Sequence, residues 1–149
     1  TNSDADAFGD VDVPWHLATV EHARAVHALM PPQGVYFANC IDVFEEGRFL
    51  AAYRATLRAV WRHVEVIGPS RDDAIPRNFV LLASDLPLDL DGLERADPRG
   101  DDLPPLPVAR YTPDELDALE RRVGAQPLTD AYAPVEALLA PVLERIAPR

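Results

Sequence analysis

The apolar run "VYFANCI" at residues 35–41 constrains the fold of this chain more than any other stretch. Its β-branched and aromatic residues predict a strand, and an apolar run of this kind suits a strand that is buried on both faces. Pro31, Pro32 and Gly34 precede the run as a turn, and Asp42 ends it. A strand buried on both faces is typical of a sheet that is covered by helices, which indicates an α/β fold.

Amphipathic helices are predicted on both sides of this strand. The segment 15–30 places apolar residues at helical spacing, with Thr19 as a potential N-cap and Pro31 as a stop. The segment 48–64 carries a broad apolar stripe, formed by Phe49, Leu50, Tyr53, Leu57, Val60, Trp61 and Val64. Arg54, Arg58 and Arg62 recur on another face of that helix, where a solvated position is expected.

Two further strands are predicted at "HVEVIG", residues 63–68, and "NFVLLAS", residues 78–84. The loop between them is too short to hold a helical crossover, so an antiparallel hairpin is expected. The order is then helix, strand, helix, strand, strand. A βα repeat that ends in an antiparallel hairpin is typical of the sheet found in S-adenosylmethionine-dependent methyltransferases.

The composition of the chain changes after about Leu86, where Pro, Gly and Asp become frequent. We expect a short helix over 89–96 and a loop that crosses the surface over 97–111. Thr112 to Gly124 then carries a full set of helix signals: an N-cap, Pro113, a capping-box Glu115 and a terminal glycine. The closing segment "APVEALLAPVLERIAP" predicts a helix that Pro141 should kink or split.

One partial domain over residues 1–149 is expected, with a sheet-and-helix portion at 6–96 and a loop with C-terminal helices at 97–149. The 149 residues and 48% hydrophobic content suit one ordinary core. No internal repeat or linker separates two cores.

Charge argues against nucleic acid as a partner. The chain has 25 acidic and 14 basic residues, all of the latter Arg, for a net charge of -11. Binding to a polyanion requires a basic stripe, which this chain lacks. An acidic surface can attract a cationic molecule, or its charges can simply be solvated. A small cationic amine or other small molecule is therefore the expected ligand class.

The cysteine and histidine content and the lengths of the apolar stretches bear on the cellular compartment and on metal binding. Cys40 is the single cysteine, so no internal disulfide or cysteine-based metal cluster can form, and a buried thiol is expected. No apolar stretch approaches the roughly 18 residues of a membrane span, and no signal-peptide pattern is present, so we expect a cytoplasmic protein without membrane contact. His22 and His27 fall on different helix faces, which supports no metal site.

Four segments, matched in order, resemble the spermidine synthase-like family, and most closely its bacterial branch. They are "DAFGDVDVPWHLAT", "GVYFANCIDVFEEGRFLAAYRATLRAVWRHVEVIG", "NFVLLASDLPLDL" and "LTDAYAPVEALLAP". An Asp-Ala-Phe triplet followed by Val-Pro-x-His-Leu-x-Thr is the signature of that branch. The resemblance covers the chain from about Asp6 to Pro141.

The resemblance implies a class I methyltransferase-type Rossmann sheet of seven strands. The runs at 35–41, 64–68 and 79–84 would be its last three strands, with the last pair antiparallel and the fourth strand ending just before Asp6. In that family a Gly-rich loop after the first strand holds S-adenosylmethionine or decarboxylated S-adenosylmethionine as donor. None of the 7 glycines here falls into a G-x-G pattern, so the donor site is expected outside these residues. The open flank of 35–41 predicts a homo-oligomer or association with an N-terminal half.

The resemblance also implies where an acceptor amine would react. Asp6 corresponds to the acidic residue beside the attacking amine, and such a carboxylate can receive or relay the proton that an ammonium must lose. His16 is a second proton-carrier candidate, because its ordinary pKa lies near neutrality, with a helix-start hydrogen bond as the alternative. Asp10, Asp12 and Trp15 are candidate substrate-binding residues; solvation and packing are their alternatives.

Further acidic residues follow the predicted strands and helices. Asp42 is expected mainly as a cap for the next helix, and Asp85 is expected to hold the turn "SDLPLD". Asp130 and Tyr132, within the matched segment "LTDAYAP", could fold over the pocket and bind substrate.

Two classes of function remain open from the sequence. The first is a transferase that moves an aminopropyl or a methyl group from an S-adenosylmethionine-type donor, with this chain as the acceptor side. The loop "GDVDVPWHL" departs from the Asp-Pro and Gly-Pro-Ala pattern of polyamine synthases, which leaves the acceptor open. The second is a non-catalytic remnant that serves as an assembly or binding module, which the missing donor loop favours for the isolated chain.

Overall fold

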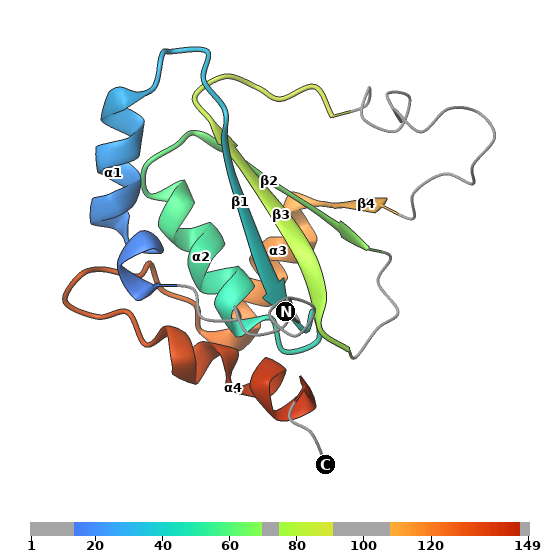
Figure 1. Ribbon diagram of the computed structural model, residues 1–149. Coiled ribbons are helices and arrows are strands. Elements are labelled where there is room, and N and C mark those ends of the chain that lie inside the picture. The colour runs from blue at the N-terminus through green and yellow to red at the C-terminus, as the bar shows by residue number, and fades with distance from the viewer. Residues whose placement is uncertain (1–13, 70–74, 91–107, 147–149) are drawn as a thin grey trace, which may run out of the picture.

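A computed structural model describes residues 14–69, 75–90 and 108–146. These residues form one sheet and the helices that pack on it (Figure 1). The predictions for Asp6, Asp10, Asp12 and for most of the helix at 89–96 fall outside these residues. The strands are β1 Tyr36–Asp42, β2 His63–Pro69, β3 Arg77–Ser84 and β4 Val108–Tyr111. The helices are the short 3₁₀ helix η2 Trp15–Leu17, α1 Val20–Leu29, α2 Arg48–Arg58, α3 Pro113–Val123 and α4 Val135–Ile146.

The four strands lie in the order β1-β3-β2-β4. β3 pairs antiparallel with β1, from Tyr36 opposite Ala83 to Asp42 opposite Arg77, and antiparallel with β2 on its other side. β1 and β2 therefore run parallel, joined through α2, with β3 inserted between them. This confirms the predicted hairpin and the α/β class, and the arrangement is that of a partial methyltransferase-like fold.

β4 corrects part of the predicted surface loop at 97–111. Residues Val108–Tyr111 pair antiparallel with β2 and extend the sheet to a fourth strand. Tyr111 is buried, and its hydroxyl donates a hydrogen bond to the Pro69 carbonyl at 2.8 Å. Its ring lies 4.6 Å from that of Phe44, so aromatic packing holds the edge strand in place.

The prediction that β1 is buried on both faces is wrong for the described residues. Ala38 and Cys40 are buried on one face, and Cys40 is thus the buried thiol expected. On the other face Phe37 leaves 64% of its surface exposed, and Asn39 is exposed as well. Successive side chains of a strand point to opposite faces, so β1 has one covered and one open face.

α2 forms the centre of the core. Phe49, Leu50 and Leu57 are at most 1% exposed, and the helix contacts β1, β2 and β3 as well as the other helices. α1 begins as predicted at Thr19, whose hydroxyl accepts a hydrogen bond from the His22 N–H at 3.3 Å.

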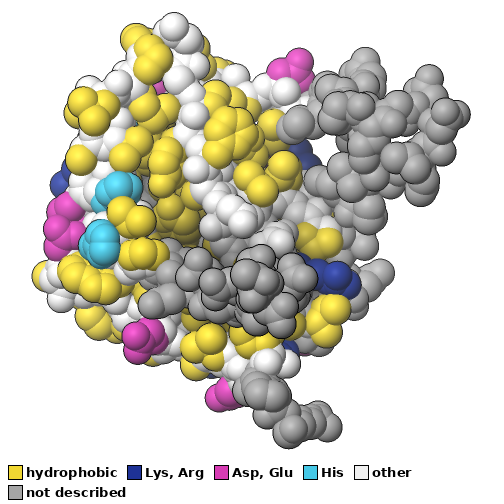
Figure 2. All heavy atoms as spheres, in the orientation of Figure 1, with side chains coloured by type: hydrophobic (Ala, Val, Ile, Leu, Met, Phe, Trp, Pro, Cys, Tyr) yellow, Lys and Arg dark blue, Asp and Glu magenta, His cyan; other side chains and the backbone are white. Residues whose placement is uncertain are grey.

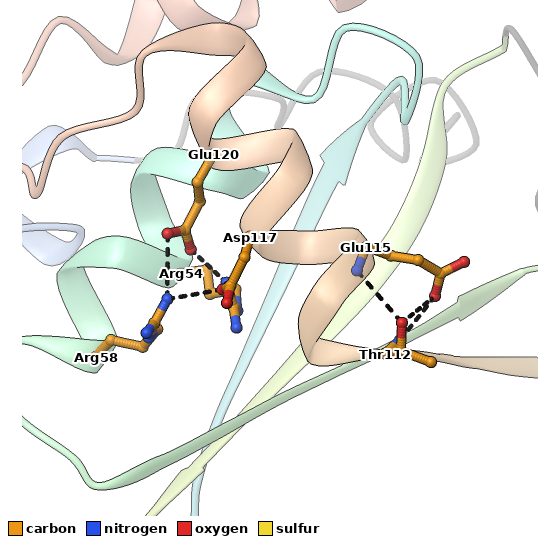
Figure 3. A network of polar contacts seen from close by, with 6 residues as sticks. All are labelled: Arg54, Arg58, Thr112, Glu115, Asp117 and Glu120. Carbon is orange, nitrogen blue, oxygen red and sulfur yellow. Dashed lines mark hydrogen bonds and ion pairs between the residues drawn. The ribbon is translucent and has the colours of Figure 1, made fainter.

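Arg54 corrects the prediction that the arginines of this helix are solvated. Its side chain is 5% exposed, and Nη1 donates to Asp117 at 2.8 Å and to Glu120 at 2.6 Å on α3 (Figure 3). The Arg58 side chain is 46% exposed and pairs with the same two carboxylates from the solvent side. Buried charges require such partners, and here they fasten α3 to α2.

The start of α3 matches its sequence signals. The Thr112 hydroxyl accepts from the Glu115 N–H at 3.3 Å, and the Glu115 carboxylate accepts from the Thr112 N–H at 2.8 Å, which completes a capping box (Figure 3). Gly124 ends the helix in the left-handed conformation. α4 runs as one helix from Val135 to Ile146 with Pro141 inside it, so of the two outcomes predicted there, a kink or a split, the split does not occur.

Candidate functional site

Asp42 ends β1 at the edge where the carboxyl ends of the two parallel strands lie. It is fully buried, and its carboxylate accepts hydrogen bonds from the Val43 N–H at 2.7 Å and from the Leu50 N–H at 2.8 Å. Leu50 lies in the first turn of α2, where N–H groups have no partner inside the helix. Asp42 is therefore the helix cap that the sequence predicts, and it fixes the loop 43–47.

Burial dominates the electrostatics of this carboxylate. Removal from water raises the pKa of Asp42 to about 6, against the lowering effect of the backbone N–H groups of Leu50, Val43 and Phe49. Because the group has no exposed surface, it acts on the shape of the site and does not meet a ligand directly.

The loop after β1 is also tied to α4. Glu46 forms a bidentate ion pair with Arg145, with distances of 3.0 and 3.1 Å. The hydrogen bond from Arg145 lowers the pKa of Glu46. α4 thus lies beyond the carboxyl end of β1 (Figure 1), and its N-terminal end lies at the groove described next.

A groove of about 580 Å³ runs between η2 and the start of α4. Its lining is Pro14, Trp15 and His16 on one side and residues 133–137 on the other. Trp15 is 48% exposed, and its ring meets the His16 ring edge-on at 5.7 Å. Glu136, an acidic residue in the first turn of α4, lines the same groove. The structure thus brings together two of the predicted residues, Trp15 and His16.

The backbone of this segment explains how the two side chains are presented. The Leu17 N–H donates to the Pro14 carbonyl at 2.8 Å, which closes the single turn of η2. The His16 carbonyl accepts from the Thr19 hydroxyl at 3.4 Å, and Thr19 caps α1. The hydrogen bond that His16 makes at the start of α1 thus uses its backbone carbonyl, and the residue lines the groove.

Tyr132 and Asp130 lie apart from this pair. Tyr132 is 65% exposed and lines a second groove of about 260 Å³, together with Arg48 of α2. Pro134 lines both grooves, so they adjoin. Asp130 lines neither of them; its backbone N–H donates to the Glu21 carboxylate at 3.0 Å.

The turn after β3 is held differently from the prediction. The Ser84 hydroxyl accepts from the Leu86 N–H at 3.1 Å, while the Asp85 carboxylate pairs with His27 of α1 at 2.7 Å. Because β3 runs antiparallel, Asp85 lies at the opposite edge of the sheet from Asp42. His27 meets Trp61 edge-on, and Trp61 stacks on Tyr36. Sequence reasoning missed this cluster, since its members are distant along the chain.

No group of three or more His, Cys, Asp or Glu side chains is placed to hold a metal ion among the described residues. None of the helices in ranges 14–69, 75–90 and 108–146 is both long and apolar enough to cross a membrane.

Comparisons with known proteins support the fold. No family model matches the chain, and no curated protein matches it. Among solved structures, the chain is similar to the crystal structure of a probable spermidine synthase from Corynebacterium glutamicum ATCC 13032, with a TM-score of 0.61 and 24% sequence identity. The match covers 84% of this chain and 45% of that chain, so these residues span less than half of its length.

Proposed function

We propose that this chain is the acceptor side of a spermidine synthase-like transferase that moves an aminopropyl or methyl group from an S-adenosylmethionine-type donor to a small amine. The observation that carries the proposal is the strand order: an antiparallel β3 between parallel β1 and β2, in a fold shared with a probable spermidine synthase. Ligands of open α/β sheets bind beyond the carboxyl ends of the parallel strands. Asp42, the loop 43–47 and α4 occupy that edge.

The groove suits a cationic amine. An ammonium group is attracted to the face of an indole ring and to a carboxylate, and Trp15 and Glu136 line the same groove. The net charge of -11 draws a cation toward this surface. We assign amine binding to Trp15 and Glu136, with Asp10 and Asp12 of the preceding segment as further carboxylates. Tyr132 lines the adjoining groove and is assigned to the part of the substrate that extends there, whereas Asp130 lines neither groove and is left out of the assignment.

The transfer step needs a free amine. The nitrogen must lose a proton before its lone pair can attack the carbon attached to the sulfonium; the new C–N bond forms as the C–S bond breaks, and the electron pair of that bond neutralises the sulfur. We assign Asp6 as the group that receives the proton, and His16 as the group that carries it to solvent. The donor would be held by residues outside these 149, since no G-x-G pattern occurs among them.

Turnover by the native protein tests the proposal. The purified protein is incubated with putrescine and either decarboxylated S-adenosylmethionine or S-adenosylmethionine, and the released thioether is quantified. Asp6→Asn should lower kcat by about 100-fold or more, because general acid–base groups contribute at least that much. Asp4→Asn, a matched carboxylate two residues away with no assigned role, should stay within about twofold.

The two variants separate the outcomes. Equal rates in both would remove Asp6 from the chemistry. No thioether with either donor would favour the second function, a non-catalytic module, which rests on the absence of a donor loop from these residues.

A further inference from the structure

The second groove, lined by Tyr132 and Arg48, has an apolar wall. It has a volume of about 260 Å³ and lies between the start of α2, the end of α3 and the start of α4. Of its lining residues, Ala52 and Leu128 are only 3% and 2% exposed, and Leu138 is half-buried. Concave apolar walls bind the apolar part of a small molecule, so this groove can hold a hydrocarbon chain.

This wall is fixed by the backbone of the loop that follows α3. The Leu128 N–H donates to the buried Thr56 hydroxyl at 2.8 Å, and the Leu128 carbonyl accepts from the Val20 N–H at 2.8 Å. Thr129 and Tyr132 exchange two backbone hydrogen bonds, at 3.0 and 2.9 Å, which hold the turn that carries Tyr132. A site whose walls are already held in place loses little entropy when a ligand binds.

Arg48 gives the second groove a positive charge. It lies in the first turn of α2, is exposed, and is the one charged residue among the described residues that line this groove. It makes no hydrogen bond or ion pair within the described part of the chain. The carboxylate of Glu46, which is close enough to interact with its charge, is already held by Arg145 at 3.0 and 3.1 Å. The Arg48 guanidinium can therefore pair with an anionic group of a ligand.

The first groove, between η2 and the start of α4, carries the opposite charge. Trp15 and Glu136 line it, and Pro134 lines both grooves. A ligand with its ammonium at Trp15 and Glu136 and its far end in the second groove would pass along the apolar wall to Arg48. A second ammonium there would be repelled by Arg48. A carboxylate would be attracted, and it can accept two parallel hydrogen bonds from a guanidinium.

We propose that the acceptor is a zwitterion: an ω-amino acid whose ammonium binds in the first groove and whose carboxylate pairs with Arg48, with its hydrocarbon spacer on the wall of the second groove. This inference rests on the proposed function and names the class of its acceptor. A diamine still places one ammonium at Trp15 and Glu136, so it binds and reacts, but less well.

The open face of the sheet is less suited to such a ligand. Figure 2 shows hydrophobic side chains gathered on the face of the sheet turned toward the viewer, with the charged side chains in view toward the margins. Phe37 and Glu65 both lie opposite Leu82, so they share the open face. Glu65 pairs with Arg110 at 3.0 Å, so its charge is already matched. The two grooves instead offer a partner for each end of a zwitterion.

Calorimetric titration of the native full-length protein tests the inference. The probes are ω-amino acids from γ-aminobutyrate to aminolaurate, each with the diamine and the monoalkylamine of equal chain length. At the length that binds best, the amino acid should bind about fivefold or more tightly than the diamine, because an exposed ion pair is gained and a repulsion is removed. The monoalkylamine, which has neither, should lie between them.

Substitutions of Arg48 assign the preference to this side chain. Arg48→Gln should bring the amino acid and the diamine to within about twofold of each other, and Arg48→Glu should reverse the order of their affinities. Arg24→Gln removes an exposed arginine of α1 that lines neither groove and should keep the native preference. An unchanged unfolding temperature in each variant shows that the fold is intact.

Other outcomes overturn the inference. A diamine that binds as tightly as the amino acid, or a preference that survives in Arg48→Gln, would mean that Arg48 does not select the acceptor. If no probe binds, the two grooves do not hold an amino acid.

Release of the thioether separates this inference from the proposed function. Turnover of putrescine without a preference for the carboxylate would leave the transferase standing and remove the zwitterionic acceptor. A preference for the carboxylate without turnover of any amine would contradict the transferase, and with it the assignment of the bound amino acid as an acceptor.

Discussion

Arg54 of α2 lies 2.6 Å from Glu120 of α3, with the guanidinium almost fully buried between the two helices (Figure 3). Asp117 accepts a second hydrogen bond from the same nitrogen. Arg54 and Asp117 are 63 positions apart in the sequence. Their charged contact positions α3 against α2, the helix that forms the centre of the core.

Arg54→Ala should destabilise the protein by about 2–3 kcal/mol, because it leaves two carboxylates without their buried partner, although the exposure of Asp117 reduces the cost below that of a fully buried pair. Arg58→Ala removes an exposed partner of the same carboxylates and should cost about 0.5 kcal/mol or less. Urea unfolding of both variants gives the comparison. Equal losses would mean that burial does not decide the strength of this network.

Asp42 should make the stability depend on pH with a negative slope. Its pKa is raised from 3.8 to about 6 in the folded state, so between these values the folded protein binds more protons than the unfolded chain. The free energy of unfolding should therefore fall by about 1–3 kcal/mol from this group as pH rises through that window. The measurement is urea unfolding at intervals from pH 4 to pH 7.

Asp42→Asn serves as the reference for this slope. The variant is less stable at every pH, since an amide cannot accept from both the Val43 and Leu50 N–H groups. The difference in stability between the native protein and the variant should shrink as pH rises from 4 to 6. A constant difference would contradict the raised pKa.

Gly47→Ala and Gly124→Ala form a matched pair. Both glycines have positive φ, 47° and 65°, so each alanine should cost about 1–2 kcal/mol from the backbone. At Gly47 the new methyl group would also lie 2.8 Å from Leu119 Cδ2, whereas at Gly124 nothing lies within 4 Å. Thermal unfolding should show Gly47→Ala as the less stable variant, and the reverse order would contradict the packing of α3 on this loop.

The contact between His27 and Asp85 should be visible in the titration of the carboxylate. The hydrogen bond from His27 lowers the pKa of Asp85. His27→Ala should move that pKa back toward the model-peptide value, because the charged form loses its main partner. Carbon NMR of the Asp85 carboxyl group measures it, with His22→Ala on the same helix as the control; a pKa that stays low in His27→Ala would assign the effect to Arg62.

Local signals in the sequence predicted the elements well. Thr112, Glu115 and Gly124 mark α3 because capping and left-handed termini depend on residues within a few positions of one another. The helix cap at Asp42 and the hairpin of β2 and β3 were predictable on the same basis. Trp15 and His16 are consecutive residues, both line the groove, and their roles toward a substrate stay predictions.

Contacts between residues far apart in the chain could not be predicted from the sequence. Arg54 repeats with Arg58 and Arg62 at helical spacing, and nothing local indicates that only the first meets carboxylates of α3. β4 was missed because its four residues follow a Pro-rich stretch, and its pairing with β2 depends on the tertiary position of Tyr111. The open face of β1 was missed because its apolar composition predicts burial on both faces. The described residues cover only one of these faces.

Donor binding by the native protein is the most direct test of the central claim, that this chain is one side of an S-adenosylmethionine-type transferase. Its thermal unfolding is followed with increasing decarboxylated S-adenosylmethionine and, separately, S-adenosylmethionine. One donor should raise Tm, by about 5–10 °C at a hundred times its Kd, and Tm should go on rising with the logarithm of the donor concentration. An unchanged Tm at millimolar concentrations of both donors would contradict it.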